Sequence, residues 1–134
     1  MVLFPKNSSV VEITPNHFDA SGNLKVEMDG KKGMIFFGAP WCGWCKKAAP
    51  EYAATSKLTG HGFHMFALDC DKYGTFAQQK FRVHAYPTIN FIDKEGKLYK
   101  KYEGERSVRG FLEGICTESL LCLKTPFHQF HRTV

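Results

Sequence analysis

Two cysteines with two residues between them form the motif with the clearest chemistry in this sequence, Cys42-Gly-Trp-Cys45. The motif follows a continuous apolar run at residues 34–37 and precedes residues 46–57, whose composition is typical of a helix. Cys42 is therefore expected at a helix N-terminus, where free backbone N–H groups stabilise the thiolate that attacks disulfides. Cys45, three positions later, is close enough to attack the mixed disulfide that results. The spacing predicts a redox-active cysteine pair.

The residues around the pair support this chemistry. Gly43 lets the intervening turn close, and Lys46 and Lys47 add positive charge nearby. Because the disulfide is itself the redox group, we expect no separate cofactor. The expected partners are protein or peptide substrates that carry thiols or disulfides, together with an upstream redox partner.

A zinc site is the main competing interpretation, because a Cys-x-x-Cys motif can supply half of its ligands. The remaining ligands would come from a scattered set: His61, His64, Cys70, His84, Cys116 and Cys122. These residues form no second Cys-x-x-Cys, the spacing from His61 to His64 is too short, and the pair His128 and His131 lies in the tail. The spacing favours redox chemistry, and we expect no metal.

The other cysteines leave more than one outcome open. The chain has five cysteines, an odd number, which excludes a fully paired disulfide framework within one chain. Cys70 follows a buried strand and is expected to be an inert core thiol. Cys116 and Cys122 flank the end of the last expected helix, where they can form a second disulfide, pass electrons to Cys42, or do neither.

The elements that must position the pair alternate along the chain. Apolar runs and alternation predict strands at residues 10–14, 24–28, 34–37, 63–68, 88–92 and 98–102, and helices at 46–57, 71–79 and 107–116. Pro50 is expected to kink the first of these helices without ending it. This order predicts an α/β fold, a β-sheet with helices on both faces.

Length and charge narrow the function classes. A chain of 134 residues fits one domain, and its net charge of +5 comes from lysines spread along the sequence. No basic stripe with interleaved aromatic residues predicts nucleic-acid binding, and no apolar run approaches the roughly 20 residues of a membrane span. The N-terminus lacks a basic segment followed by an apolar one, so we expect a cytoplasmic location.

Four segments together resemble one known family. Residues 37–46 (FGAPWCGWCK), Pro50, residues 85–89 (AYPTI) and residues 102–106 (YEGER) resemble, in this order, the thioredoxin superfamily. The similarity is greatest to the catalytic domains of protein disulfide isomerases, and it covers about residues 9–116. The resemblance implies a thioredoxin fold with a central mixed sheet, a domain at residues 1–116, and a C-terminal extension at 117–134 that is either packed on the domain or flexible.

The resemblance also implies roles for the residues at the site. Cys42 would be the exposed nucleophile and Cys45 the buried resolving thiol, with the Trp41 ring beside them. Arg106 matches a family arginine that swings toward the resolving cysteine. These roles imply a thiol–disulfide oxidoreductase of the thioredoxin or protein disulfide isomerase type.

Substrate binding is implied at the segment that contains Tyr86 and Pro87. Pro87 would follow a cis peptide bond, and Tyr86 would offer backbone groups to an extended substrate peptide, a form of strand addition. The alternative function is a peptide-binding or chaperone module that keeps the fold without redox turnover. The intact cysteine pair argues against this alternative.

The sequence departs from the family at two places. Trp44 stands where the isomerases have histidine and thioredoxin has proline, so the pair loses a positive charge that favours the thiolate, and the ring can form an apolar rim. The family's buried acid falls on Phe36 and its partner lysine on Ala67. Cys45 therefore lacks the usual proton acceptor, which water or Glu51 would have to replace, and we expect mixed disulfides to resolve slowly.

Overall fold

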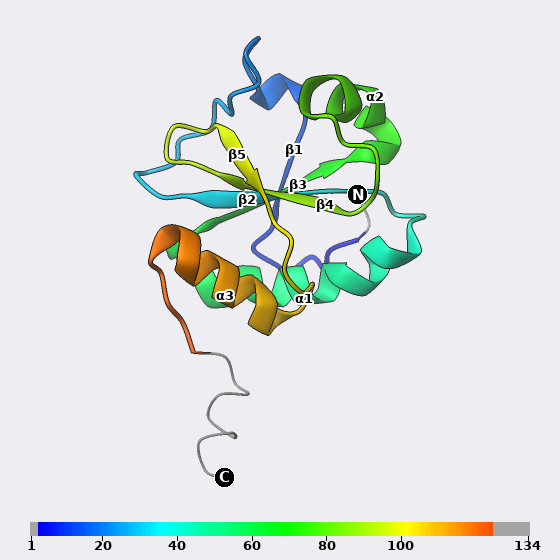
Figure 1. Cartoon of the computed structure of the whole chain (residues 1–134). Coiled ribbons are helices and arrows are strands. Elements are labelled where there is room, and N and C mark those ends of the chain that lie inside the picture. The colour runs from blue at the N-terminus through cyan, green and yellow to red at the C-terminus, as the bar shows by residue number, and fades with distance from the viewer. Residues whose placement is uncertain (1–2, 125–134) are drawn as a thin grey trace.

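Five strands form one mixed sheet in the computed structural model, which describes residues 3–124. The spatial order is β1-β3-β2-β4-β5. Strands β1, β3 and β2 are parallel to one another, and β4 pairs antiparallel with both of its neighbours, β2 and β5. The strands are β1 (Val11–Ile13), β2 (Gly33–Gly38), β3 (His64–Asp69), β4 (Thr88–Ile92) and β5 (Leu98–Lys101). Helices α1 (Gly43–Thr59) and α3 (Val108–Ser119) cover one face and α2 (Cys70–Phe81) the other (Figure 1). The predicted α/β thioredoxin fold is confirmed.

The central strand β2 is buried on both faces of the sheet. Met34 and Phe36 belong to the core cluster under α1 and α3, whereas Ile35 and Phe37 belong to the cluster under α2. Successive side chains of a strand point to opposite faces, so only an unbroken apolar run can fill both clusters. This burial fixes the end of β2, and with it the position from which the chain enters α1.

The strand predicted at residues 24–28 is wrong. Leu24 and Met28 are buried, as the alternation indicated, but the segment makes only an isolated bridge between Phe18 and Leu24. Its backbone groups bond to loops instead, since Leu24 N–H donates to the Gly96 carbonyl and Lys25 N–H to that of His17. A period of two reports alternating burial, and a strand requires in addition a neighbouring strand in register.

The ends of the helices follow local capping chemistry. Cys42 caps α1, which contains Pro50, and the Ser107 side chain accepts a hydrogen bond from Gly110 N–H at the start of α3. Two short 3-10 helices, Pro15–His17 and Gly60–Gly62, complete the described elements.

The C-terminal extension begins inside the last helix. Helix α3 runs three residues past the expected boundary at Cys116, and Leu121 and Leu123 pack against the first core cluster. Cys116 and Cys122 form a disulfide, one of the outcomes left open by the sequence. Residues 125–134 of the extension lie outside the described part of the chain.

The segment between β5 and α3 is held tightly against the domain. The Tyr102 hydroxyl donates to the Glu105 carbonyl, and a side chain at Gly110 or Gly114 would collide with the Tyr102 ring or hydroxyl. Close approach of backbone to ring requires glycine here. The packing places the residues between Tyr102 and Ser107 beside the first turns of α1.

Replacing Gly110 by alanine tests this contact. The new methyl group would meet the Tyr102 hydroxyl at 2.8 Å and also the Glu105 carbonyl oxygen. Overpacking costs about 1–3 kcal/mol, more than the roughly 1 kcal/mol that alanine gains over glycine in a helix. We expect Gly110→Ala to lower the free energy of unfolding in urea by about 1 kcal/mol.

Gly43→Ala is the matched control, because it is also a helical glycine but has no atom within 4 Å of the added carbon. We expect this variant to be as stable as the parent or slightly more stable. Equal stabilities of the two variants would contradict the proposed contact.

Candidate redox site

Cys42 lies at the N-terminal cap of α1, as the motif predicted. Its Sγ accepts a hydrogen bond from Cys45 N–H at 3.2 Å and contacts the Tyr86 carbonyl oxygen at 3.6 Å. Cys42 is only 9% exposed, so it is more enclosed than the exposed nucleophile that the resemblance implied, whereas Cys45 is fully buried. Backbone N–H groups at a helix N-terminus stabilise negative charge, so Cys42 is the cysteine of the pair whose surroundings suit a thiolate.

The Cys45 thiol holds its proton strongly. Burial, and after it the hydrogen bond with the Cys42 side chain, raises the pKa of Cys45 to about 12. A hydrogen bond from the Ala39 backbone lowers the pKa but does not offset these effects. Resolution of a mixed disulfide therefore requires a base that removes a proton from a buried, neutral thiol.

The neighbourhood of Cys45 supplies no carboxylate at the two family positions. Phe36 and Ala67 are register partners on β2 and β3, and both are fully buried. The Phe36 ring packs on Tyr52, with ring centroids 5.1 Å apart. Apolar side chains thus occupy the place that the resemblance assigns to a charged pair.

Glu51, the predicted substitute base, is engaged elsewhere. Its Oε1 accepts a hydrogen bond from Val108 N–H at 3.2 Å, at the start of α3. None of the interactions that shift the pKa of Cys45 comes from Glu51. Glu51 in this arrangement caps a helix, and water is the remaining proton acceptor of those considered.

The segment of Tyr86 and Pro87 meets the cysteine pair, and its Tyr86–Pro87 peptide bond is cis, as the resemblance implied. The Tyr86 ring lies edge-on to Trp41 with centroids 5.9 Å apart, and its hydroxyl hydrogen-bonds the Cys70 thiol. Tyr86 therefore connects Cys42, Trp41 and Cys70.

Asp71 is a site residue that the sequence analysis missed. Its Oδ1 accepts a hydrogen bond from Trp41 Nε1 at 2.8 Å. Asp71 and Cys70 form the first turn of α2, so this turn holds both aromatic residues beside Cys42. The signal in the sequence was an acidic residue two positions after the end of a buried strand, at the same edge of the sheet where the Cys42 loop begins.

Cys70 is buried, and that burial raises its pKa to about 12, which fits the predicted inert thiol.

Two exposed indole rings flank Cys42. Trp41 is 61% exposed and Trp44 is 65% exposed, and the Lys47 ammonium lies 5.5 Å from the centre of the Trp44 ring. Large apolar side chains grouped on a surface are typical of interaction sites, whereas isolated ones are common. They form the apolar rim that the sequence predicted at Trp44.

Arg106 is exposed, and its Nη2 donates to the Pro87 carbonyl at 3.4 Å. It makes no interaction that shifts the pKa of Cys45 in this arrangement. Its swing toward the resolving cysteine stays a prediction.

A groove of about 720 Å³ opens beside Trp44. One wall is a single face of α1, and the other is the segment between β5 and α3. The lining residues are Trp44, Lys47, Ala48, Glu51, Lys101, Tyr102, Glu103, Gly104 and Arg106.

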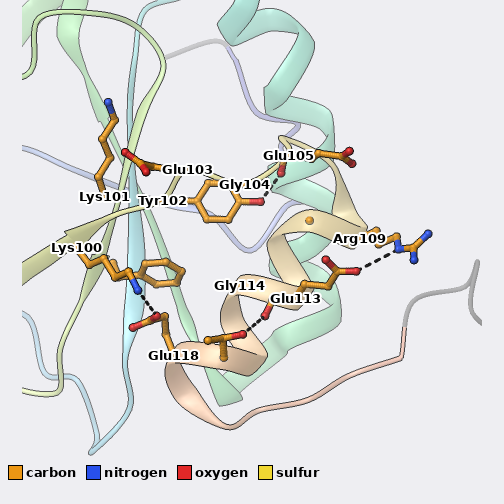
Figure 2. Close-up of a pocket in the computed structure, with 13 residues that line it drawn as sticks. Lys100, Lys101, Tyr102, Glu103, Gly104, Glu105, Arg109, Glu113, Gly114 and Glu118 are labelled. Carbon is orange, nitrogen blue, oxygen red and sulfur yellow. Dashed lines mark hydrogen bonds and ion pairs between the residues drawn. The ribbon is translucent and has the colours of Figure 1, made fainter.

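A second hollow of about 590 Å³ lies between β5 and α3 and is shown in Figure 2. Four of its charged side chains form two ion pairs, Lys100 with Glu118 at 2.9 Å and Arg109 with Glu113 at 3.2 Å. The hydrogen bond from Lys100 lowers the pKa of Glu118 below its usual value. No cysteine lines this hollow, so it is separate from the redox site.

Two further findings concern the described residues alone. They contain no group of three or more His, Cys, Asp or Glu side chains that could hold a metal ion, and His128 and His131 lie outside them. None of the helices between residues 3 and 124 is both long and apolar enough to cross a membrane.

The fold and the capped cysteine pair define a thioredoxin-type domain. The family model described as thioredoxin matches residues 9–116. The chain belongs to the thioredoxin family.

Curated relatives are named as protein disulfide isomerases. The chain is 35% identical over 117 residues to protein disulfide isomerase-like 2-2 of Oryza sativa subsp. japonica. This alignment covers 86% of this chain and 30% of the relative. It is 30% identical over 115 residues to the protein disulfide-isomerase A6 homolog of Drosophila melanogaster, covering 86% of this chain and 25% of the relative. The chain thus spans less than a third of either relative.

Solved structures show the same fold. The Trx4 domain of ERdj5 aligns with a TM-score of 0.67 at 22% identity, over 83% of this chain and 96% of that domain. The zinc-bound form of human ERp44 aligns with a TM-score of 0.68 at 20% identity, over 81% of this chain and 31% of that one.

Phe36→Glu tests the missing proton acceptor. A disulfide reagent that releases a coloured thiolate reports two steps, attack by Cys42 and then resolution by Cys45. In the parent we expect the second step to accelerate about tenfold per pH unit from pH 6 to 9, because the thiolate fraction of Cys45 rises by that factor below its pKa of about 12. We expect Phe36→Glu to accelerate the second step at pH 7 by at least about tenfold, as a general base does.

Phe36→Gln is the matched control, since it places a polar group of the same size in the core without a proton acceptor. Either variant loses several kcal/mol of stability from burying a polar group, so circular dichroism first establishes that both are folded. Equal resolution rates in the two variants would show that a carboxylate at this position does not assist Cys45.

Proposed function

We propose that the chain is a thiol–disulfide oxidoreductase domain that exchanges disulfides with protein substrates. The observation that carries this proposal is the position of Cys42 Sγ, which accepts the Cys45 N–H at the first turn of α1. The family membership and the names of the curated relatives support it.

The reaction proceeds in two exchanges. The Cys42 thiolate attacks one sulfur of a substrate disulfide, and the other sulfur leaves as a thiolate that takes up a proton. Cys45 then loses its proton and attacks Cys42 Sγ, which releases the second substrate thiol and forms the Cys42–Cys45 disulfide. Two electrons pass to the substrate, and an upstream dithiol returns them to the pair. The reverse sequence oxidises a substrate dithiol.

The substrate surface is formed by the rim around Cys42. The backbone of Tyr86 and Pro87 is placed to bond an extended peptide, because the Tyr86 carbonyl already lies 3.6 Å from Cys42 Sγ. Trp41 and Trp44 offer apolar contact on either side, and the groove beside Trp44 can take adjacent residues of the same peptide.

Paired serine variants test the assignment. The assay measures how fast the protein reduces a disulfide-linked protein such as insulin, with dithiothreitol as the source of electrons. We expect the double variant Cys42→Ser, Cys45→Ser to abolish this catalysis, because both reacting sulfurs are lost. The matched control, Cys116→Ser, Cys122→Ser, also removes two cysteines and is expected to retain at least about half of the parent rate. If the parent is inactive in this assay, and the Cys42→Ser, Cys45→Ser variant still binds peptides, the result would favour the peptide-binding module instead.

The reduction potential of the Cys42–Cys45 pair indicates the direction of electron flow, and Trp44→His tests how residue 44 contributes to that potential. A cationic histidine beside Cys42 stabilises the thiolate and makes the disulfide a stronger oxidant, so we expect its reduction potential to rise by about 30 mV, a tenfold change in the exchange constant with glutathione. Trp44→Phe is the neutral control. A parent value near about −270 mV would mark a reductant, and one near about −180 mV an oxidant or isomerase. The proposal needs no cofactor beyond the disulfide. The cytoplasmic location stays a prediction, and the reduction potential of the parent also bears on it.

A further inference from the structure

We propose that the Cys116–Cys122 disulfide is a second redox site, which small thiols such as glutathione cleave at Cys122 and which locks the end of α3 onto the domain. The proposal does not depend on the activity of the first pair. It rests on the exposure of Cys122 compared with that of Cys116, on the place of both residues at the end of a helix, and on the contacts of the residues around them.

The disulfide closes a short loop over the end of α3. Cys116 lies in the last turn of the helix and Cys122 six residues later, with 4.3 Å between their Cα atoms. Between them, Leu120 adopts a left-handed backbone with φ of 65° and its N–H bonds the Cys116 carbonyl at 3.0 Å. Leucine rarely adopts this conformation, which glycine usually supplies where a helix ends, and the disulfide bridges the residues on either side of it.

The locked loop places apolar side chains on the domain. Leu121 lies against Gly62 so closely that a carbon added there would come within 2.9 Å of it. Leu123 packs against the same core cluster as Leu121. Cleaving the disulfide removes the covalent link between these contacts and α3.

The two sulfurs differ in access. Cys122 is exposed, whereas Cys116 is half-buried on the helix. A thiolate attacks a disulfide along the sulfur–sulfur axis, so a small thiol reaches Cys122 Sγ from solvent and displaces Cys116.

The second pair lies far from the first. Cys42 caps the start of α1, and Gly62, which contacts Leu121, lies just beyond its end. A helix of 17 residues spans about 25 Å at 1.5 Å per residue. Figure 1 shows the start of α1 and the end of α3 at opposite ends of the same layer. The electron transfer from Cys116 and Cys122 to Cys42 that the sequence left open cannot occur directly within this fold.

Helix electrostatics give the two pairs opposite character. Cys42 meets free N–H groups at a helix N-terminus, whereas Cys122 Sγ lies 3.8 Å from the Cys116 carbonyl at a helix C-terminus. The negative end of the helix dipole disfavours a thiolate. The reduced second pair is therefore a poor nucleophile toward protein disulfides. The same dipole also disfavours Cys116 as a leaving thiolate, so the access of a small thiol to Cys122, and not helix electrostatics, carries the cleavage.

The reaction balances with two molecules of glutathione. The first thiolate bonds to Cys122 Sγ, and the Cys116–Cys122 bond breaks with Cys116 leaving as a thiolate that takes a proton from water. The second attacks the glutathione sulfur of the mixed disulfide and releases Cys122. The protein disulfide gains two electrons, and two glutathione molecules become one glutathione disulfide.

The test uses the full chain with Cys42→Ser and Cys45→Ser, so failure of the proposed redox activity has no influence on it. The protein is equilibrated in glutathione buffers of increasing reduction, quenched with acid, alkylated, and mapped by peptide mass spectrometry. We expect Cys116 and Cys122 to pass from paired to free together, at the same buffer ratio as in the parent, with the transient glutathione adduct on Cys122. We also expect amide hydrogen exchange at residues 116–123 to accelerate at least tenfold once the pair is reduced.

Cys116→Ser, Cys122→Ser is the matched variant, and it should show the faster exchange without any reductant. The proposal is overturned if both thiols are free in every buffer, or if the pair stays oxidised in the most reducing one. The proposal is also overturned if the glutathione adduct forms only on Cys116, or if replacing Cys42 and Cys45 shifts the titration tenfold. Amide exchange that stays unchanged on reduction would overturn it as well.

Discussion

The hydrogen bond from Cys45 N–H to Cys42 Sγ is the interaction on which the rest of the site depends. It exists because α1 begins after a connection of only four residues, 39–42, from β2, whose end is fixed by burial on both faces of the sheet. A helix started one residue earlier or later would turn Cys42 away from the free N–H groups of its first turn. The reactivity of one sulfur is thus set by the packing of a strand that contains no reactive group.

The same helix electrostatics act in opposite senses at the two ends of the domain. The N-terminus of α1 favours charge on Cys42, and the C-terminus of α3 disfavours charge on Cys116 and Cys122. One chain can therefore carry one pair suited to attack and another suited to remain bonded until a thiol cleaves it. The number of cysteines does not distinguish these roles, whereas their places on helices do.

Aromatic packing around the pair has a chemical consequence as well as a structural one. Phe36 occupies a place in the core that the resemblance assigns to an acid, which strengthens the apolar cluster and leaves Cys45 without a nearby base. On the opposite side, the first turn of α2 holds Trp41 through Asp71 and Tyr86 through Cys70. An apolar interior and an aromatic rim are obtained together, and the buried Cys45 thiol is left without a carboxylate that could accept its proton.

The sequence by itself determined the fold class, most element positions and the cysteine pair, because apolar periodicity and helix capping are local properties. Its alternation at residues 24–28 reported burial correctly but not strand pairing, which depends on a distant partner. Only the tertiary structure decided that Trp41 bonds Asp71, that Glu51 caps α3, and that Cys116 pairs with Cys122. Contacts of this kind depend on how separate elements are placed in space, which the local pattern of either partner does not determine by itself.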